Sequence, residues 1–246
     1  MIKEGERLDD LEVNGLKLIQ NPKLYCFTSD SVLLANTAKV KRKDKVLDLC
    51  SGSGIVGILI ASKQGAKSVD LVEIQPEMAN LAERNVKLND LEDVVKVYEI
   101  SVQEAADALG CEKYDVVVCN PPYQKVGTGK TAENEQIAVC KTELKLTFFE
   151  LAKAVRKLLK FGGKFYFIHN AERTAELIAT LHANSLQTKK ITLVKPKASK
   201  EPDTVIIEAV KGGKCGVKFD FLTVFDEDGN YTDRVKKLQS LEYNFF

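Results

Sequence analysis

The sequence predicts an α/β fold in which a mostly parallel sheet carries helices on both faces. From Val46 onward, short apolar runs rich in β-branched residues alternate with stretches of helical periodicity. Alternating units of this length form parallel sheets, whose buried strands read as continuous apolar runs. The last expected strands follow one another without a helix between them, which predicts an antiparallel strand at the sheet edge.

A small N-terminal extension precedes this alternation. Polar and apolar residues alternate at 15–20, which is typical of an edge strand. A helix is expected at about 29–39, because three residues that can cap a helix precede apolar residues at helical spacing. The expected units are 1–40, a strand and helix that pack on the core, and 41–246, the main domain.

The first half of the main domain has four expected strands. A helix after the first strand ends near Lys63, and Pro76 suits the first turn of a second helix. Two consecutive prolines, Pro121 and Pro122, end the fourth strand because they can continue neither a sheet nor a helix. The ranges are 46–49, 68–73, 94–98 and 114–120 for the strands, and about 54–63, 76–88 and 103–109 for the helices.

The second half begins with a polar stretch and ends with closely spaced strands. Residues 124–140 are rich in Gly, Lys and polar residues and have little periodicity, which predicts a loop. An amphipathic helix is expected next, ended by Gly162 and Gly163. The ranges are 144–159 and 172–184 for helices, and 164–168, 189–194, 204–210 and 218–225 for strands.

Composition narrows the classes of function and compartment. The formal net charge is +1, so the overall charge does not by itself indicate a nucleic-acid partner. Six scattered cysteines without a Cys-x-x-Cys pair, and only two histidines, argue against a metal site. No apolar run reaches membrane-spanning length, and the N-terminus lacks the apolar core of a signal peptide. We therefore expect a protein of the reducing cytoplasm, without membrane or metal.

A glycine-rich turn after the first main strand predicts a nucleotide-type cofactor. Gly52, Gly54 and Gly57 match the dinucleotide fingerprint, and Glu73 ends the next strand, where it can accept both ribose hydroxyls. However, Asp48 lies inside the apolar strand before the glycines. This carboxylate would repel the pyrophosphate of NAD but attract the amino group of S-adenosylmethionine. The spacing favours S-adenosylmethionine over NAD.

These motifs resemble the class I S-adenosylmethionine-dependent methyltransferases. The resemblance implies a Rossmann-like methyltransferase fold with a mostly parallel seven-stranded sheet and an antiparallel edge strand. One departure concerns Ser101, which stands where that family usually has an acid that meets the cofactor adenine. The cofactor-binding residues it implies are Asp30, Asp48, Ser51, Gly52, Gly54, Glu73, Ile74, Ser101, Val102 and Asn120.

The tetrapeptide Asn120-Pro121-Pro122-Tyr123 is similar to the motif of methyltransferases that act on planar nitrogens. The lone pair of such an amine is delocalised, so it is a poor nucleophile. The resemblance implies that the Asn120 side-chain oxygen and the Pro121 carbonyl accept its two N–H bonds. Tyr123 would stack on the substrate base. Orientation of the amine then supplies much of the rate enhancement, and all four residues are predicted to be catalytic.

Nearly the whole chain resembles the bacterial tRNA adenine-N(6) methyltransferase family. The similarity includes residues 27–35, the glycine turn, the tetrapeptide, the segment 195–198 and the stretch 228–232. It implies methylation of the tRNA adenosine immediately 3′ of the anticodon, with RNA as partner. Two alternatives share the chemistry: a glutamine-N5 methyltransferase of translation factors, and a guanine-amine methyltransferase of ribosomal RNA. The sequence indicates no oligomeric state.

Three groups of basic residues could contact RNA phosphates. One follows the tetrapeptide, one lies between the late strands and one precedes the first main strand. Each could equally be an ordinary solvated surface. The groups are Lys125 and Lys130; Lys195, Lys197 and Lys200; and Lys39, Lys41, Arg42, Lys43 and Lys45.

Overall fold

The structure is a computed structural model that describes residues 2–24, 26–121, 123 and 146–239. The strands are β1 (Arg7–Asp10), β2 (Lys17–Gln20), β3 (Lys45–Leu49), β4 (Ser68–Glu73), β5 (Val95–Glu99), β6 (Tyr114–Cys119), β7 (Leu159–Asn170), β8 (Leu186–Lys195), β9 (Thr204–Lys211) and β10 (Lys218–Thr223). The helices are α1 (Ser29–Thr37), α2 (Ile55–Gln64), α3 (Pro76–Leu88), α4 (Ala105–Leu109), α6 (Phe148–Leu158), α7 (Thr174–Ala183) and α8 (Asp233–Gln239), with a 3₁₀ turn, η1 (Ala171–Arg173).

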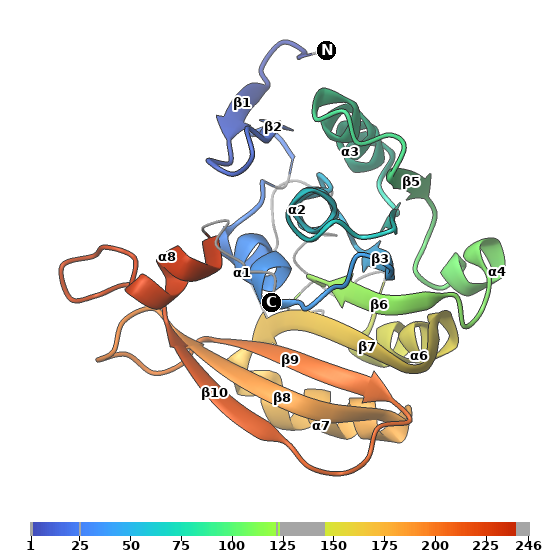
Figure 1. Cartoon of the computed structure of the whole chain (residues 1–246), viewed down its shortest axis with the longest axis vertical. Helices are drawn as coiled ribbons and strands as arrows, with labels where there is room; N and C mark the ends of the chain where they lie inside the picture. Colours follow the sequence, from blue (N-terminus) through green and yellow to red (C-terminus); the bar gives the residue numbers. More distant parts are fainter. Residues whose placement is uncertain (1, 25, 122, 124–145, 240–246) are drawn as a thin grey trace.

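The central sheet has the strand order β10-β8-β9-β7-β6-β3-β4-β5 (Figure 1). From β3 the chain first builds outward through β4 and β5 and then crosses to β6 on the other side. The β3–β6 boundary is therefore a topological switch point, where ligands of open α/β sheets bind at the carboxyl ends of the strands. The Rossmann-like fold is confirmed.

Two details of the sheet differ from the expectation. It has eight strands in the described part of the chain rather than seven, because β10 pairs in parallel with β8 and extends the sheet. The antiparallel strand is β9, which lies inside the sheet between β7 and β8 and not at the edge. A short connection between β8 and β9 explains the reversal, but sequence periodicity does not indicate which neighbour a strand pairs with.

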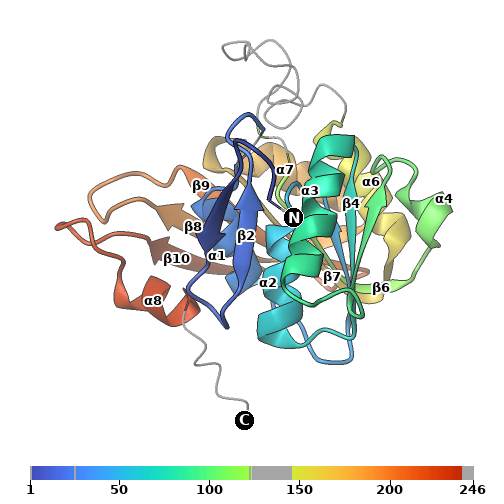
Figure 2. The same cartoon turned by 90° about the horizontal axis from the view of Figure 1, so that it is seen from above.

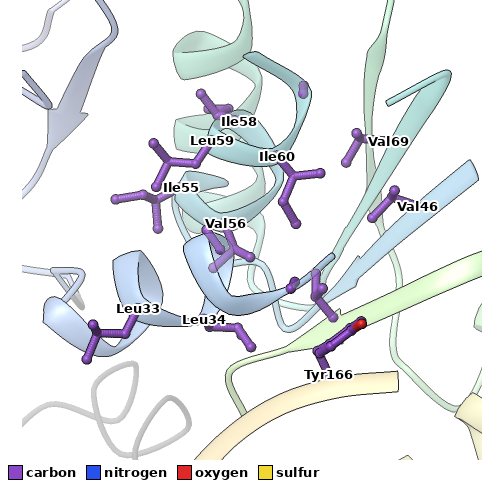
Figure 3. Close-up of a cluster of buried hydrophobic side chains, with 14 of the residues drawn as sticks. Leu33, Leu34, Val46, Ile55, Val56, Ile58, Leu59, Ile60, Val69 and Tyr166 are labelled. Atoms are coloured by element: carbon purple, nitrogen blue, oxygen red, sulfur yellow. The ribbon is translucent and has the colours of Figure 1, made fainter. Parts of the chain in front are cut away.

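Two apolar layers cover the sheet. One joins α1, α2, α3 and α8 to one face, and Figure 3 shows side chains of α1 and α2 converging on Val46, Val69 and Tyr166. The other joins α4, α6 and α7 to the opposite face. Because strand residues alternate between faces, Leu47 lies under the second layer and Asp48 points to the side of α2.

The N-terminal hairpin of β1 and β2 packs beside α3 (Figure 2). Two asparagines, Asn85 in α3 and Asn89 at the C-cap of this helix, pair with the free edge of β2 as another strand would. Asn85 accepts a hydrogen bond from the Ile19 N–H at 2.7 Å and donates to the Ile19 carbonyl at 3.2 Å. Asn89 does the same for Lys17, at 2.9 and 2.8 Å. Backbone groups of β2 are thereby satisfied without a third strand.

The helix before β7 is shorter than expected. Thr147 and Glu150 form a capping box that begins α6 at Phe148. The helix ends at Leu158 and β7 starts at the next residue, so Gly162 and Gly163 lie within the strand and do not end the helix. Within the described residues, no helix is both long and apolar enough to cross a bilayer.

Candidate active site

A pocket lies at the switch point, at the carboxyl ends of β3, β4 and β6. It joins the glycine turn, the end of β4, the turn after β5 and the start of the tetrapeptide. The lining residues are Phe27, Ser31, Asp48, Cys50, Ser51, Gly52, Ser53, Ile55, Val56, Val72, Glu73, Ile74, Gln75, Ile100, Val102, Gln103, Asn120 and Leu146.

Asp48 is a buried carboxylate on the α2 side of the sheet. Its Oδ2 accepts a hydrogen bond from the Gly57 N–H at 3.0 Å. A Cβ at Gly57 would lie 2.2 Å from Leu71 Cδ2, so only glycine allows α2 to pack this close to the strands. Burial raises the pKa of Asp48 to about 8, and the nearby charge of Glu73 adds to the effect. A cation bound here would favour the ionised form.

Glu73 lies at the end of β4 and is also buried. Its Oε2 accepts from the Gly52 N–H and its Oε1 from the Gln75 N–H, both at 2.9 Å. Burial nevertheless raises its pKa. These two bonds fix the carboxylate between the glycine turn and the start of the connection after β4. A carboxylate has further lone pairs with which to accept ligand hydroxyls.

The glycine turn contains an unusual polar atom. The hydroxyl oxygen of Ser51 is buried and has no hydrogen-bond partner among the described residues. Gly52 and Gly54 have φ angles of 56° and 85°, which glycine adopts without strain. Gly54 packs toward Leu71 rather than lining the pocket. A buried hydroxyl without a partner is costly, so Ser51 is a natural contact for a polar ligand.

The turn after β5 arranges its residues differently from the expectation. The Ser101 hydroxyl donates to Glu104 Oε2 at 2.6 Å, and Ser101 does not line the pocket. Its neighbours Ile100, Val102 and Gln103 do. Ser101 is therefore not placed in the pocket, where the resemblance predicts a contact with the cofactor adenine. The carboxamide of Gln103 offers a polar group at the same turn.

Asn120 is held from both ends of its side chain. Its Nδ2 donates to the Ser31 hydroxyl at 3.0 Å, and its Oδ1 accepts from the Tyr123 hydroxyl at 2.6 Å. The Tyr123 hydroxyl also lies 3.0 Å from Asp30 Oδ2. The side-chain amide is therefore fixed in one orientation, with Oδ1 and Nδ2 each assigned by a partner.

The end of β7 supports Tyr123. The fully buried His169 ring lies with its centroid 5.0 Å from that of Tyr123, tilted by 36°. The Arg173 Nη1 donates to the Tyr123 carbonyl at 3.1 Å. Burial, followed by the charge of Arg173, lowers the pKa of His169 to about 4, so the imidazole is neutral near pH 7. Aromatic packing and a charge-assisted hydrogen bond both hold Tyr123.

The predicted site residues divide into two sets. Seven of the predicted cofactor-binding residues line the pocket: Asp48, Ser51, Gly52, Glu73, Ile74, Val102 and Asn120. Asp30, Gly54 and Ser101 do not, and Pro121 and Tyr123 lie beside the pocket rather than in its lining. Pro122 lies outside the described residues.

Several pocket residues were not predicted. Gln75, Ile100 and Gln103 carry no motif, so only their proximity to the predicted residues along the chain could have indicated them. Phe27 belongs to the segment 27–35 that resembles the family, but no role is predicted for it. Ser31 neighbours Asp30, but nothing in the sequence indicates its bond to Asn120, a residue 89 positions away.

The two described basic groups lie at opposite ends of the parallel strands of the central sheet. Lys195 ends β8, and Lys197 and Lys200 follow it, at the edge that carries the pocket. Residues 39–44 precede β3 and Lys45 begins it, so this group lies at the amino ends of the parallel strands, away from the site. Lys125 and Lys130 lie outside the described residues. Among the residues that are described, His, Cys, Asp and Glu form no cluster of three or more suited to a metal ion.

The methyltransferase small domain family matches residues 19–192. The chain belongs to this family. A protein of Dyadobacter fermentans named tRNA1(Val) (adenine(37)-N6)-methyltransferase is 30% identical over 168 residues, 67% of each chain. A putative protein N5-glutamine methyltransferase of Methanocaldococcus jannaschii is 37% identical over 128 residues, 52% of this chain and 58% of that protein.

The solved structures agree with the family in fold. A predicted O-methyltransferase from Agrobacterium tumefaciens matches with a TM-score of 0.68 and 24% identity, over 85% of this chain and 95% of that chain. As a member of the methyltransferase small domain family, the protein is a methyltransferase with a Rossmann-like fold.

Proposed function

We propose that this methyltransferase uses S-adenosylmethionine to methylate the exocyclic amine of adenine in RNA, at the tRNA adenosine immediately 3′ of the anticodon. The observation that carries the proposal is the place of Asn120. Its carboxamide lines the same pocket as Asp48 and Glu73, the residues suited to the cofactor. The name of the Dyadobacter fermentans relative supports the choice of adenine in tRNA.

The pocket residues fit the cofactor. The unpartnered Ser51 hydroxyl offers a hydrogen bond to a polar group. Asp48 would be stabilised in its ionised form by the amino group of the methionyl part, and Glu73 would accept from the ribose hydroxyls. The half-exposed Ile74 side chain offers an apolar surface to the adenine. When bound, S-adenosylmethionine supplies an electrophilic methyl group on a sulfonium centre.

Asn120 would orient the substrate amine. An amide oxygen has two lone pairs, so Oδ1 can accept a substrate N–H besides the Tyr123 hydroxyl. The Pro121 carbonyl would accept the second N–H. With both hydrogens directed this way, the nitrogen lone pair faces the methyl group. In this orientation the nitrogen would accept the methyl group that the bound cofactor supplies, and the amine would then release one proton to solvent.

Tyr123 would stack on the base. The His169 ring supports one side of the Tyr123 ring, and Arg173 fixes its backbone. A rigid aromatic ring binds a base at little cost in conformational entropy, and such stacking is worth about 1–3 kcal/mol. A base within a folded RNA must be unstacked or flipped to reach this position.

A second candidate is methylation of a glutamine side chain in a protein. The 37% identity to the putative glutamine methyltransferase favours it. A glutamine carboxamide is also a planar nitrogen with two N–H bonds, so Asn120 and Pro121 would meet it in the same way. The peptide chain would have to enter where the RNA backbone does in the first candidate.

The test is methyl transfer from isotopically labelled S-adenosylmethionine to three substrates in parallel. These are total tRNA from cells that lack the anticodon-loop modification, ribosomal RNA, and a glutamine-containing translation-factor peptide. Mass spectrometry of nucleosides and peptides locates the label. Label as N6-methyladenosine in tRNA is the expected result. Label as N2-methylguanosine in ribosomal RNA, or on glutamine alone, would replace the proposal by one of the alternatives.

A further inference from the structure

Asp30 lies near the site but outside the pocket lining. It lies in the first turn of α1 together with Ser31, and each of the two residues contacts a different side chain of the tetrapeptide. The Ser31 hydroxyl accepts from Asn120 Nδ2 at 3.0 Å, and Asp30 Oδ2 lies 3.0 Å from the Tyr123 hydroxyl. One turn of α1 therefore holds Asn120 directly and Tyr123 through its hydroxyl.

The Tyr123 hydroxyl connects Asp30 to Asn120. Its oxygen lies 2.6 Å from Asn120 Oδ1, so the three groups form a continuous chain from carboxyl to hydroxyl to amide. A phenol has one proton to donate and can also accept. The chain is continuous when the Asp30 carboxyl is protonated and donates to the phenol oxygen, which then donates to Asn120 Oδ1. In that arrangement Asp30 sets the position of the hydroxyl, and the hydroxyl sets Asn120.

We propose that Asp30 is a positioning residue for methyl transfer, which acts through the Tyr123 hydroxyl to orient the Asn120 carboxamide toward the substrate amine. The inference rests on the proposed function in that Asn120 meets the amine. It assigns Asp30 to the substrate side of the site and not to the cofactor. Asp30 is half-buried, and burial is the main cause that raises its pKa. The hydrogen bond with Tyr123 lowers the pKa and the charge of Asp203 raises it, and the net shift is upward.

In this proposal the Tyr123 hydroxyl positions Asn120, a role separate from stacking of the Tyr123 ring on the base. If the ring only stacked on the base, phenylalanine would serve equally well. Because the hydroxyl bonds to Asn120, we expect Tyr123→Phe to lower kcat even though the ring remains. Loss of a preorganised group at the reacting atoms costs up to 10²–10³ in rate, and an indirect contact should cost less, roughly tenfold.

The test is a double-variant cycle of Asp30→Ala and Tyr123→Phe, with Asp107→Asn on the exposed surface of α4 as control. Three quantities are measured for each variant: kcat, KM and the Kd of S-adenosylhomocysteine. We expect each single variant to lower kcat roughly tenfold, and the double variant to be no worse than Tyr123→Phe. Cofactor Kd should stay within about twofold of wild type, and Asp30→Asn, which keeps a polar group at the same distance, should restore most of kcat.

Two outcomes would overturn the proposal. A large rise in cofactor Kd with unchanged kcat in Asp30→Ala would make Asp30 a cofactor ligand. Multiplication of the two single effects in the double variant would show that Asp30 and Tyr123 act independently. Should Asp30→Ala not fold, Asp30→Ser keeps a polar residue at the start of α1 but is too short to reach Tyr123. The cycle is run on whichever substrate the wild type methylates, so failure of the adenine assignment leaves this test intact.

Discussion

Asp48 is a carboxyl group that the fold buries beside a second buried acid, Glu73. Burial disfavours its ionised form, so in the proposed function binding of the cofactor's amino group would be coupled to release of a proton from Asp48. The direction of the pH dependence of binding follows from the pKa of Asp48, which is about 8 in the free protein. Below that pH, binding of a cationic amino group at Asp48 would require the carboxyl to release its proton, and above that pH Asp48 is already ionised.

We expect the affinity for S-adenosylhomocysteine to rise as pH is raised from about 6 to about 8, by as much as tenfold per unit. Calorimetry in buffers of different ionisation enthalpy should show release of about one proton at the lower pH. Asp48→Asn should bind weakly at every pH and lose this slope. An affinity independent of pH in the wild type would mean that Asp48 does not meet the ligand cation.

The same pKa shift affects the stability of the free protein. The folded pKa of Asp48 is above the unfolded value of 3.8, so its contribution to the free energy of unfolding falls as pH rises from about 4 to about 8. At pH 8, we therefore expect Asp48→Asn to unfold at a higher urea concentration than wild type when no cofactor is present. A lower midpoint would contradict the account of Asp48 as a destabilised acid.

The sequence was informative about single residues where a motif fixes both position and chemistry. Asp48 and Glu73 were predicted because an acid in an apolar strand and an acid at a strand end each need a reason. The resemblance predicts Asp30 as a cofactor ligand, and the structure shows a contact of Asp30 with the Tyr123 hydroxyl that the sequence does not predict. That contact joins residues 93 positions apart, and no local pattern encodes it.

The helix α3 serves as both a core helix and a substitute strand. Asn85 is fully buried, and besides pairing with β2 it donates to the Ser53 carbonyl of the glycine turn at 3.0 Å. It therefore links the N-terminal hairpin to the pocket. The helical pattern of 76–88 was predictable, but the hydrogen-bonding role of Asn85 was not, because a polar residue on a helix usually indicates its solvated side.

We expect Asn85→Ala to lower the free energy of unfolding by about 2–4 kcal/mol, because it leaves buried backbone groups of Ile19 without partners. The matched variant is Asn89→Ala, whose bonds to Lys17 are nearer the surface and can be replaced by water. Its cost should be about 1 kcal/mol. Urea unfolding measures both, and equal costs would contradict the role of burial.

The whole molecule places its basic groups at two opposite edges of one sheet. The alternation of strands and helices predicted this sheet, but the position of β9 inside it and the addition of β10 depend on long-range pairing that periodicity does not specify. The topology also distinguishes the basic groups, because the sequence predicts each of them equally as a possible RNA contact. Only the group after β8 shares an edge with the pocket.

We expect replacement of Lys195, Lys197 and Lys200 by Ala to weaken tRNA binding and to flatten its salt dependence. Each lost phosphate contact should reduce the slope of log K against log salt by about 0.7–0.9. Replacement of Lys41, Arg42 and Lys43 at the opposite edge is the control and should leave the slope unchanged. An equal effect of the two triple variants would mean that the RNA is not confined to the edge with the pocket.

The proposed role of Asn120 is to orient a planar amine for methyl transfer, and the single-turnover rate of Asn120→Ala measures that role. The variant is saturated with labelled S-adenosylmethionine and mixed with the substrate that the wild type methylates. We predict a rate lower by about 10²–10³, because a preorganised group at the reacting nitrogen is lost, with the Kd of S-adenosylhomocysteine close to that of wild type. A near-normal rate in a folded, cofactor-binding variant would contradict amine methylation at this motif.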